Sequence, residues 1–253
     1  KVGAVCLGPF GRRVAFTRPD GMIAVVSADG GPATDLVSFI GDETPKDNPA
    51  TGLQWPASEG GEWIYYFDGR NGGRNNTLRR VNATTREDQF VVTFNRGASG
   101  GFALSMDATP RHGTLVKRTD NYVIAIYDLS AGDGDLYSCP RAGGCGESLS
   151  PDGALFVANN GWHTVGTLYD LTGRGQQSFR LNQWDGDPTD GISDRGKVEW
   201  AWQFFRWSVN SMKWIAVTQG KLKVPSTHEI HFSDAVVYNW VDGQQINITG
   251  NPP

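Results

Sequence analysis

Four aspartates are concentrated in one glycine- and proline-containing segment, residues 182–194. They are Asp185, Asp187, Asp190 and Asp194. Ca²⁺ binds six to eight oxygen ligands, and a loop of this composition can bend to present several carboxylates to one ion. The spacing is not that of an EF-hand, and no glutamate closes the loop. The segment is therefore a candidate Ca²⁺ site, and the alternative is a solvated acidic connection whose aspartates form turns.

Aromatic residues are abundant between residues 200 and 214, and a polar loop with one more tryptophan covers residues 159–163. An exposed indole can stack on the apolar face of a sugar while polar side chains bind its hydroxyls. We therefore predict a ligand-binding surface formed by Asn160, Trp162, His163, Arg206, Trp207 and Asn210. The alternative is that the aromatic side chains of residues 200–214, Trp207 included, pack in the core.

Motifs for a catalytic nucleophile or a phosphate-binding loop are absent from the sequence. His228 and His231 are one residue too close for the helical zinc motif, which needs histidines four apart. We therefore predict no catalytic residue. A polysaccharide-active enzyme remains the alternative, either a lyase in which His112, His163 or His231 removes a proton, or a glycoside hydrolase whose paired carboxylates leave no local signature.

Three cysteines bear on the compartment of the protein. Cys139 and Cys145 bracket a Pro-Arg-Ala-Gly-Gly loop flexible enough to bring the two side chains within disulfide distance. A disulfide predicts a secreted protein, extracellular or periplasmic, and the alternatives are two free thiols or half of a metal site. Cys6 lies in an apolar strand, where we expect a buried and inert thiol. Three Asn-x-Thr sequons, at Asn75, Asn82 and Asn247, are compatible with secretion.

Charge and hydropathy limit the partners. The net charge is −4 and basic residues form no cluster, which argues against nucleic acid. No apolar run approaches the roughly 18 residues of a spanning helix, so we expect no membrane insertion. The partners that remain are carbohydrate or an extracellular protein. Lys1 begins no signal peptide, so we expect a mature chain or an excised segment.

The elements that must position these residues are strands. The chain has 33 glycines and 13 prolines, which interrupt nearly every window long enough for a helix. Residues 148–160 predict a strand, a Ser-Pro-Asp-Gly turn and a second strand, and residues 165–171 and 177–181 predict two more. This four-stranded unit is a propeller blade. The same order recurs at a spacing of about 40–50 residues, in units covering approximately 1–40, 50–96, 100–144, 145–182 and 198–250.

The unit resembles the TolB-like repeat, a PD40 repeat related to WD40, whose mark is Ser-Pro-Asp-Gly followed by an apolar strand. Residues 150–153 match the motif fully, while residues 8–11 (Gly-Pro-Phe-Gly) and 208–211 (Ser-Val-Asn-Ser) are degenerate versions. The resemblance implies an all-β β-propeller formed by residues 1–253 as a single domain. We expect five blades of four antiparallel strands, or six if the chain is a fragment.

Propellers of this kind serve many functions, so the fold alone does not select one. The absent catalytic motifs, the predicted disulfide and the 9 tryptophans favour an extracellular recognition module that binds carbohydrate or a surface partner without catalysis of its own. The alternatives are the polysaccharide-active enzyme above and a structural subunit of a larger extracellular assembly. The sequence indicates no cofactor apart from the candidate Ca²⁺ ion.

Overall fold

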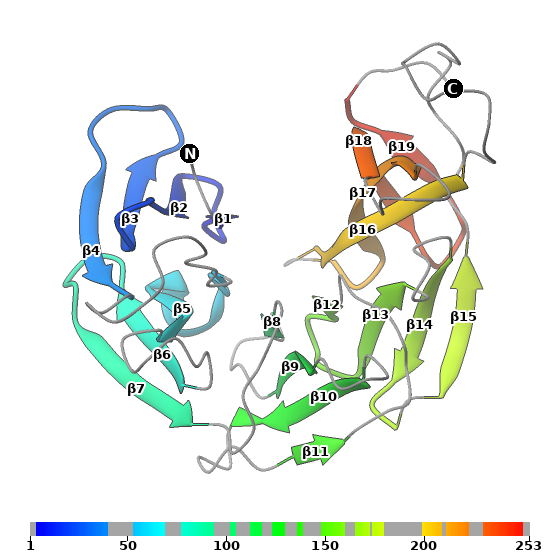
Figure 1. The fold of residues 1–253 in the computed structure, drawn as a ribbon, viewed down its shortest axis with the longest axis horizontal. Helices are drawn as coiled ribbons and strands as arrows, with labels where there is room; N and C mark the ends of the chain where they lie inside the picture. The colour runs from blue at the N-terminus through cyan, green and yellow to red at the C-terminus, as the bar shows by residue number, and fades with distance from the viewer. Residues whose placement is uncertain are drawn as a thin grey trace. The chain divides into compact units, whose positions relative to one another are not determined.

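The computed structural model describes residues 4–39, 53–68, 77–93, 102–104, 112–117, 123–129, 136–138, 148–159, 165–172, 174–179, 199–208, 211–222 and 230–249 (Figure 1). Two compact units are present, Lys1–Arg118 with Ala125–Ser138, and Thr119–Ile124 with Cys139–Pro253. Within the described ranges the chain forms five antiparallel sheets, four of four strands and one of three. No helix in these ranges has the length and apolar character needed to cross a membrane.

The first sheet is an up-and-down meander in which each strand pairs with the next along the chain. Its strands are β1 (Val5–Leu7), β2 (Arg13–Thr17), β3 (Met22–Ser27) and β4 (Thr34–Ser38). The register places Ala15 opposite Cys6 and Val25. Since side chains alternate along a strand, one face of the sheet carries Ala15, Ile23 and Val25, all of which are buried.

The second sheet has three strands, β5 (Trp63–Asp68), β6 (Thr77–Asn82) and β7 (Asp88–Thr93), preceded by the 3-10 helix η1 (Ser58–Gly61). The sequence predicts a further strand at residues 52–56, of which residue 52 lies outside the described residues. The described residues contribute one bridge there, between Gln54 and Tyr65. Pro56 prevents this pairing from continuing on its side of the bridge. The next hydrogen-bonded position of this antiparallel pair falls on residue 56, and proline has no amide hydrogen to donate.

The remaining three sheets repeat the meander. The third contains β8 (Phe102–Leu104), β9 (His112–Lys117), β10 (Val123–Asp128) and β11 (Leu136–Ser138). The fourth contains β12 (Ser148–Leu149), β13 (Leu155–Asn159), β14 (Gly166–Asp170) and β15 (Gly175–Phe179). The fifth contains β16 (Glu199–Trp207), β17 (Trp214–Leu222), β18 (Ile230–Asn239) and β19 (Gln245–Asn247). Strands consecutive in sequence are neighbours in every sheet, so each sheet is a local unit.

Both faces of the second sheet are buried. Ile64, Tyr66 and Val81 on one face pack in a core cluster with the buried residues of the first sheet. Tyr65 and Phe67 on the other face belong to a second cluster that includes Leu129, which follows β10. A strand covered on both faces reads as a continuous apolar run rather than an alternating one, which explains the sequence Trp-Ile-Tyr-Tyr-Phe of β5.

One ion pair lies beside this core. Arg79 donates two hydrogen bonds of 3.0 Å to the carboxylate of Asp88, and the hydroxyl of the fully buried Tyr66 donates a third at 2.8 Å. Asp88 raises the pKa of Arg79 above its ordinary value. The Asp88 side chain is 19% exposed. A partly buried carboxylate is tolerated when its oxygens are satisfied by donors, so these contacts let β6 and β7 carry charge next to an apolar cluster.

The second compact unit has its own core between the fourth and fifth sheets. Its buried side chains are Val157, Leu168, Phe179, Phe205, Trp207, Ile215, Val217, Val236 and Tyr238. The ring of Phe179 stacks on Tyr238 with the centroids 4.3 Å apart and meets Phe205 edge-on at 6.1 Å. Phe179 is thus fixed by two aromatic neighbours, and this limits what can be placed next to it.

Gly166 in β14 tests that packing. A Cβ on Gly166 would lie 2.5 Å from the Cζ atom of Phe179, whereas a Cβ on Gly175 in β15 would meet nothing nearer than 3.6 Å. We expect Gly166→Ala to lower the free energy of unfolding by about 1–3 kcal/mol through overpacking. Gly175→Ala is the matched control and should change it by less than about 0.5 kcal/mol. Guanidinium unfolding followed by tryptophan fluorescence gives both values, and equal midpoints would contradict the packing described.

Candidate functional site

Most of the residues predicted as sites lie outside the described residues. These are Asn160, Trp162, His163 and Asn210 of the ligand surface, the four aspartates 185, 187, 190 and 194, and the cysteines 139 and 145. Their roles remain predictions. Within the described ranges, no group of three or more His, Cys, Asp or Glu residues is placed to hold a metal ion. Cys6, which the sequence predicts to be buried, is half-buried.

Arg206 and Trp207 are described, and β16 directs them to opposite faces. Trp207 is 3% exposed, packs edge-on against Trp240 with the centroids 6.3 Å apart, and donates its backbone N–H to Ser148 Oγ at 3.0 Å. Arg206 is exposed and donates to the carbonyl of Phe205 at 2.8 Å. The structure therefore does not bring the two side chains onto one surface. Trp207 takes the core position that the sequence left open as its alternative.

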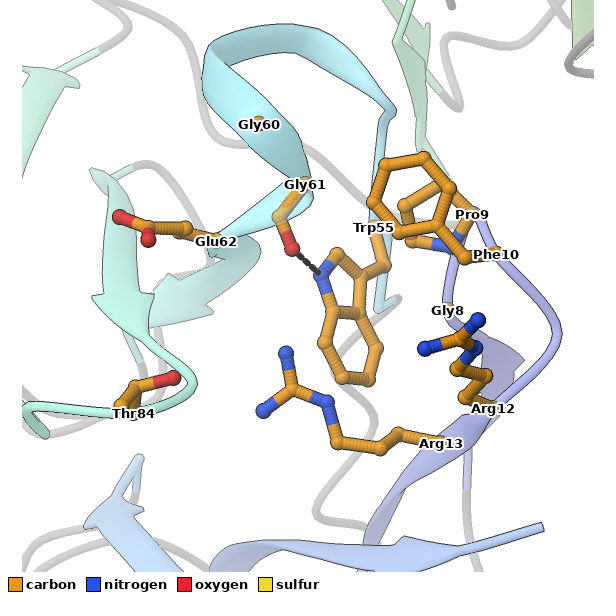
Figure 2. Close-up of a pocket in the computed structure, with 10 residues that line it drawn as sticks. All are labelled: Gly8, Pro9, Phe10, Arg12, Arg13, Trp55, Gly60, Gly61, Glu62 and Thr84. Atoms are coloured by element: carbon orange, nitrogen blue, oxygen red, sulfur yellow. Dashed lines mark hydrogen bonds between the residues drawn. The ribbon is translucent and has the colours of Figure 1, made fainter.

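A pocket of about 470 Å³ lies in the first compact unit, where three turns come together (Figure 2). One turn connects β1 to β2, the second contains η1 and the third connects β6 to β7. The residues that line the pocket are Gly8, Pro9, Phe10, Arg12, Arg13, Trp55, Gly60, Gly61, Glu62 and Thr84. Loops on a rigid scaffold are common positions for binding residues, so this pocket is the candidate site.

The β1–β2 turn has the backbone of a regular repeat turn. The Gly8 N–H donates to the Arg13 carbonyl at 2.8 Å, and the Gly11 N–H donates to the Gly8 carbonyl at 2.9 Å. In the Ser-Pro-Asp-Gly turn, Ser150 and Leu155 take the places of Gly8 and Arg13, and both bonds measure 2.9 Å. The last glycine of each turn has a positive φ, 69° at residue 11 and 68° at residue 153. The two turns are therefore equivalent position by position.

Their side chains differ. In the regular turn, Asp152 accepts hydrogen bonds from Ser150 Oγ at 2.6 Å and from the Ala154 N–H at 3.0 Å, so the turn satisfies its own polar groups. Phe10 stands at the position of Asp152, and its ring is 66% exposed. The two positions after the glycine carry Arg12 and Arg13 instead of alanine and leucine. Phe10 thus replaces the aspartate that bonds its own turn, and the two positions that follow the glycine carry guanidinium groups in place of apolar side chains.

Trp55 forms a wall of the pocket. It is 2% exposed, and its indole Nε1–H donates to the Gly61 carbonyl at 2.8 Å (Figure 2). A Cβ on Gly8 would lie 3.3 Å from the Trp55 ring and 3.1 Å from the Arg13 carbonyl, so glycine permits this close approach. The η1 turn and the β1–β2 turn are thereby packed directly on one another.

Polar groups complete the lining. The Arg13 guanidinium lies over the Trp55 ring, 5.0 Å from its centroid, and donates to the Ala83 carbonyl at 3.3 Å. The exposed Glu62 accepts a hydrogen bond of 3.4 Å from Asn82 Nδ2. Asn82 itself is buried and also caps the β6–β7 turn through the N–H groups of Thr84 and Thr85. Donors, an acceptor and apolar surface therefore face one cavity, an arrangement suited to binding a small polar ligand.

Clusters of tryptophan, aspartate and histidine in the sequence do not point to this pocket, because its lining contains none of those clusters. The signal that was available is the comparison between repeats. Residues 8–11 align with residues 150–153, and the aspartate of the repeat is replaced by Phe10. An aromatic residue at this position cannot make the backbone hydrogen bonds that the aspartate makes, so its presence here calls for another role.

No protein-family model matches the sequence, and no curated protein matches it either. Solved structures do match, each over 97% of this chain. Hydrazine synthase from Kuenenia stuttgartiensis has 13% identity, a TM-score of 0.53 and 65% of its chain covered. TolB from Acinetobacter baumannii has 17% identity, a TM-score of 0.58 and 54% covered. The nidogen/laminin complex provides a match with 10% identity, a TM-score of 0.58 and 78% covered.

These similarities show the fold. The chain is an all-β β-propeller, as the sequence predicted, and it is similar in structure to TolB and to other propellers at low identity. It spans less than two thirds of the hydrazine synthase chain and about half of the TolB chain. Because one fold supports many functions, the activity has to be argued from the pocket.

Gly60 and Gly61 offer a test of how the pocket is built. Both have a positive φ, 72° and 67°, so alanine is strained at either position. A Cβ on Gly61 would also lie 2.6 Å from the Pro9 ring and 2.9 Å from Phe10, whereas a Cβ on Gly60 meets nothing nearer than 3.9 Å. We expect Gly61→Ala to be less stable than Gly60→Ala by about 1–3 kcal/mol. Urea unfolding measures the difference, and equal stabilities would show that the two turns do not touch.

Proposed function

We propose that this chain is a recognition module without catalysis of its own, and that it binds a carbohydrate in the pocket lined by the β1–β2 turn and Trp55. One observation carries the proposal. Phe10 replaces the aspartate that stabilises the equivalent turn, and its ring is 66% exposed at the pocket. Replacing the aspartate by an exposed phenyl ring removes local hydrogen bonds and adds apolar surface. A ligand that covers this surface removes it from water, which favours binding.

The chemistry of a sugar matches the lining. A pyranose has apolar faces of C–H groups and a rim of hydroxyls. The rings of Pro9 and Phe10 offer an apolar surface (Figure 2). Arg12 and Thr84 can donate to hydroxyl oxygens, and the Glu62 carboxylate can accept from hydroxyl hydrogens. The volume of about 470 Å³ lies within the usual range for small-molecule sites.

The walls of the pocket are held before any ligand arrives. Trp55 is fixed by its bond to Gly61, and Arg13 is held by the indole on one side and by the Ala83 carbonyl on the other. A preorganised site loses little side-chain entropy on binding. The side chains that remain exposed, such as Phe10 and Arg12, are then the ones that adapt to the ligand.

We further propose that the protein works outside the cytoplasm, with a glycan or a glycan-bearing surface as its partner, and that its repeats belong to the TolB-like family. The Ser-Pro-Asp-Gly turn supports the family, and the Cys139–Cys145 spacing supports the oxidising compartment.

The compartment has a direct test. Mass spectrometry of a protease digest made without reductant should find residues 139 and 145 joined in one disulfide-linked species, because a secreted chain keeps this bond. Cys6 is the internal control, since its half-buried thiol should react with an alkylating agent after unfolding. Recovery of both cysteines as free thiols from the protein exported by its native host would contradict the proposal.

The binding function is tested on a glycan array, with the affinity for a bound glycan then measured by calorimetry. We expect Phe10→Ala to weaken binding about tenfold, because aromatic stacking and the apolar area of the ring are lost. Phe90→Ala is the matched control. Phe90 is 58% exposed in the same compact unit but does not line the pocket, so its removal should leave the affinity unchanged.

Two results would overturn the proposal. One is an array that stays at background for every glycan at high protein concentration. The other is a Phe10→Ala protein that folds normally and binds as tightly as the original.

A further inference from the structure

The pocket has a charge opposite to that of the chain as a whole. The net charge of the protein is −4. The lining, in contrast, contains two arginines, Arg12 and Arg13, and a single carboxylate, Glu62. A positively charged lining attracts anions and repels cations within about one Debye length, beyond which salt screens the charge. The charge of the lining therefore favours an anionic ligand.

Arg12 has no partner in the part of the chain that the structure describes. Its guanidinium group forms no hydrogen bond and no ion pair there. Two other described arginines are neutralised, since Arg18 pairs with Asp20 and Asp35, and Arg79 pairs with Asp88. Arg86, like Arg12, has no ion pair among the described residues. An exposed arginine is not unusual by itself, but Arg12 stands in a turn whose equivalent holds Ala154 and lies at a cavity.

Arg13 is partly satisfied and fixed in place. One N–H group, on Nη1, is bonded to the Ala83 carbonyl at 3.3 Å, and the flat face of the guanidinium lies over Trp55. The remaining N–H groups have no bond to another described residue. In the view of Figure 2, the guanidinium group of Arg12 lies on the other side of the Trp55 indole from that of Arg13. Both arginines line the same pocket.

From these observations we infer that the ligand is an acidic sugar, and that its carboxylate is bound by Arg12, while Arg13 adds positive charge to the same lining. This inference rests on the carbohydrate-binding function proposed above. A planar guanidinium matches a carboxylate with two parallel N–H···O bonds. The sugar ring then lies along Phe10, and Glu62 remains available for a hydroxyl group. Because Glu62 leaves the lining with a small excess of positive charge, a sugar with one negative charge fits best.

The test compares three ligands. Two are a uronate sugar as the free acid and the same sugar as its neutral methyl ester. The third is a sulfated sugar without a carboxylate. Calorimetry with the full chain measures each affinity. We expect the acid to bind at least tenfold more tightly than the ester, and its affinity to fall as the salt concentration rises. The sulfated sugar should bind more weakly than the acid.

Variants locate the effect. Arg12→Gln should weaken binding of the acid about 10- to 100-fold, because a charge-assisted hydrogen bond is lost, while binding of the ester should hardly change. Arg12→Lys keeps the positive charge but not the two parallel N–H donors of the guanidinium, so it should give an intermediate loss of affinity for the acid. Arg174→Gln is the control, since it removes the same charge from a 79% exposed side chain that does not line the pocket.

The outcomes separate this inference from the function on which it rests. If the acid and the ester bind equally, and Phe10→Ala weakens both, the pocket binds sugars and the acidic specificity is wrong. A sulfated sugar that binds more tightly than the acid also overturns the specificity. If none of the three binds and the glycan array is blank, the proposed function itself fails.

Discussion

The turn between the first two strands of a sheet is closed by backbone hydrogen bonds, and this leaves its side chains free to vary. The bonds from Gly8 to Arg13 and from Gly11 to Gly8 recur, with nearly the same lengths, in the turn that begins at Ser150. Both turns end in a glycine with a φ near 68°. Because the backbone is fixed by these contacts, Phe10 can occupy the third position without changing the path of the chain. The fold therefore tolerates a functional side chain there.

The buried second sheet determines where that side chain lies. Ile64 and Tyr66 pack against the first sheet on one face, while Tyr65 and Phe67 are covered on the other. With its neighbours fixed in this way, the turn before β5 meets the turn after β1, and Gly61 comes against Pro9 and Phe10. Neither turn forms a pocket alone. The pocket follows from packing consecutive sheets, which is the basic step in building a propeller.

Sequence periodicity was sufficient for the fold, because strands that alternate with tight turns leave a strong local pattern. Within the predicted strand at residues 52–56, the described residues form one bridge at Gln54, and Pro56 prevents pairing from continuing on its side. Periodicity was less informative about the site. Trp207 appeared suitable for ligand binding, yet its side chain is buried by the neighbouring sheet. Whether an aromatic ring faces solvent depends on how neighbouring sheets pack. The sequence of a single strand does not show this packing.

The pocket divides its residues into two classes with different constraints. Gly8, Trp55 and Gly61 hold the turns together, since the Trp55 ring fits against Gly8 and its N–H satisfies the Gly61 carbonyl. These contacts take over the stabilising role that Asp152 has in the regular turn. Phe10 and Arg12 are exposed and line the pocket, and Phe10 also touches Gly61. Substitution of the first class costs stability, whereas substitution of the second changes what is bound. A propeller can therefore acquire a new specificity at one turn while its sheets remain as they are.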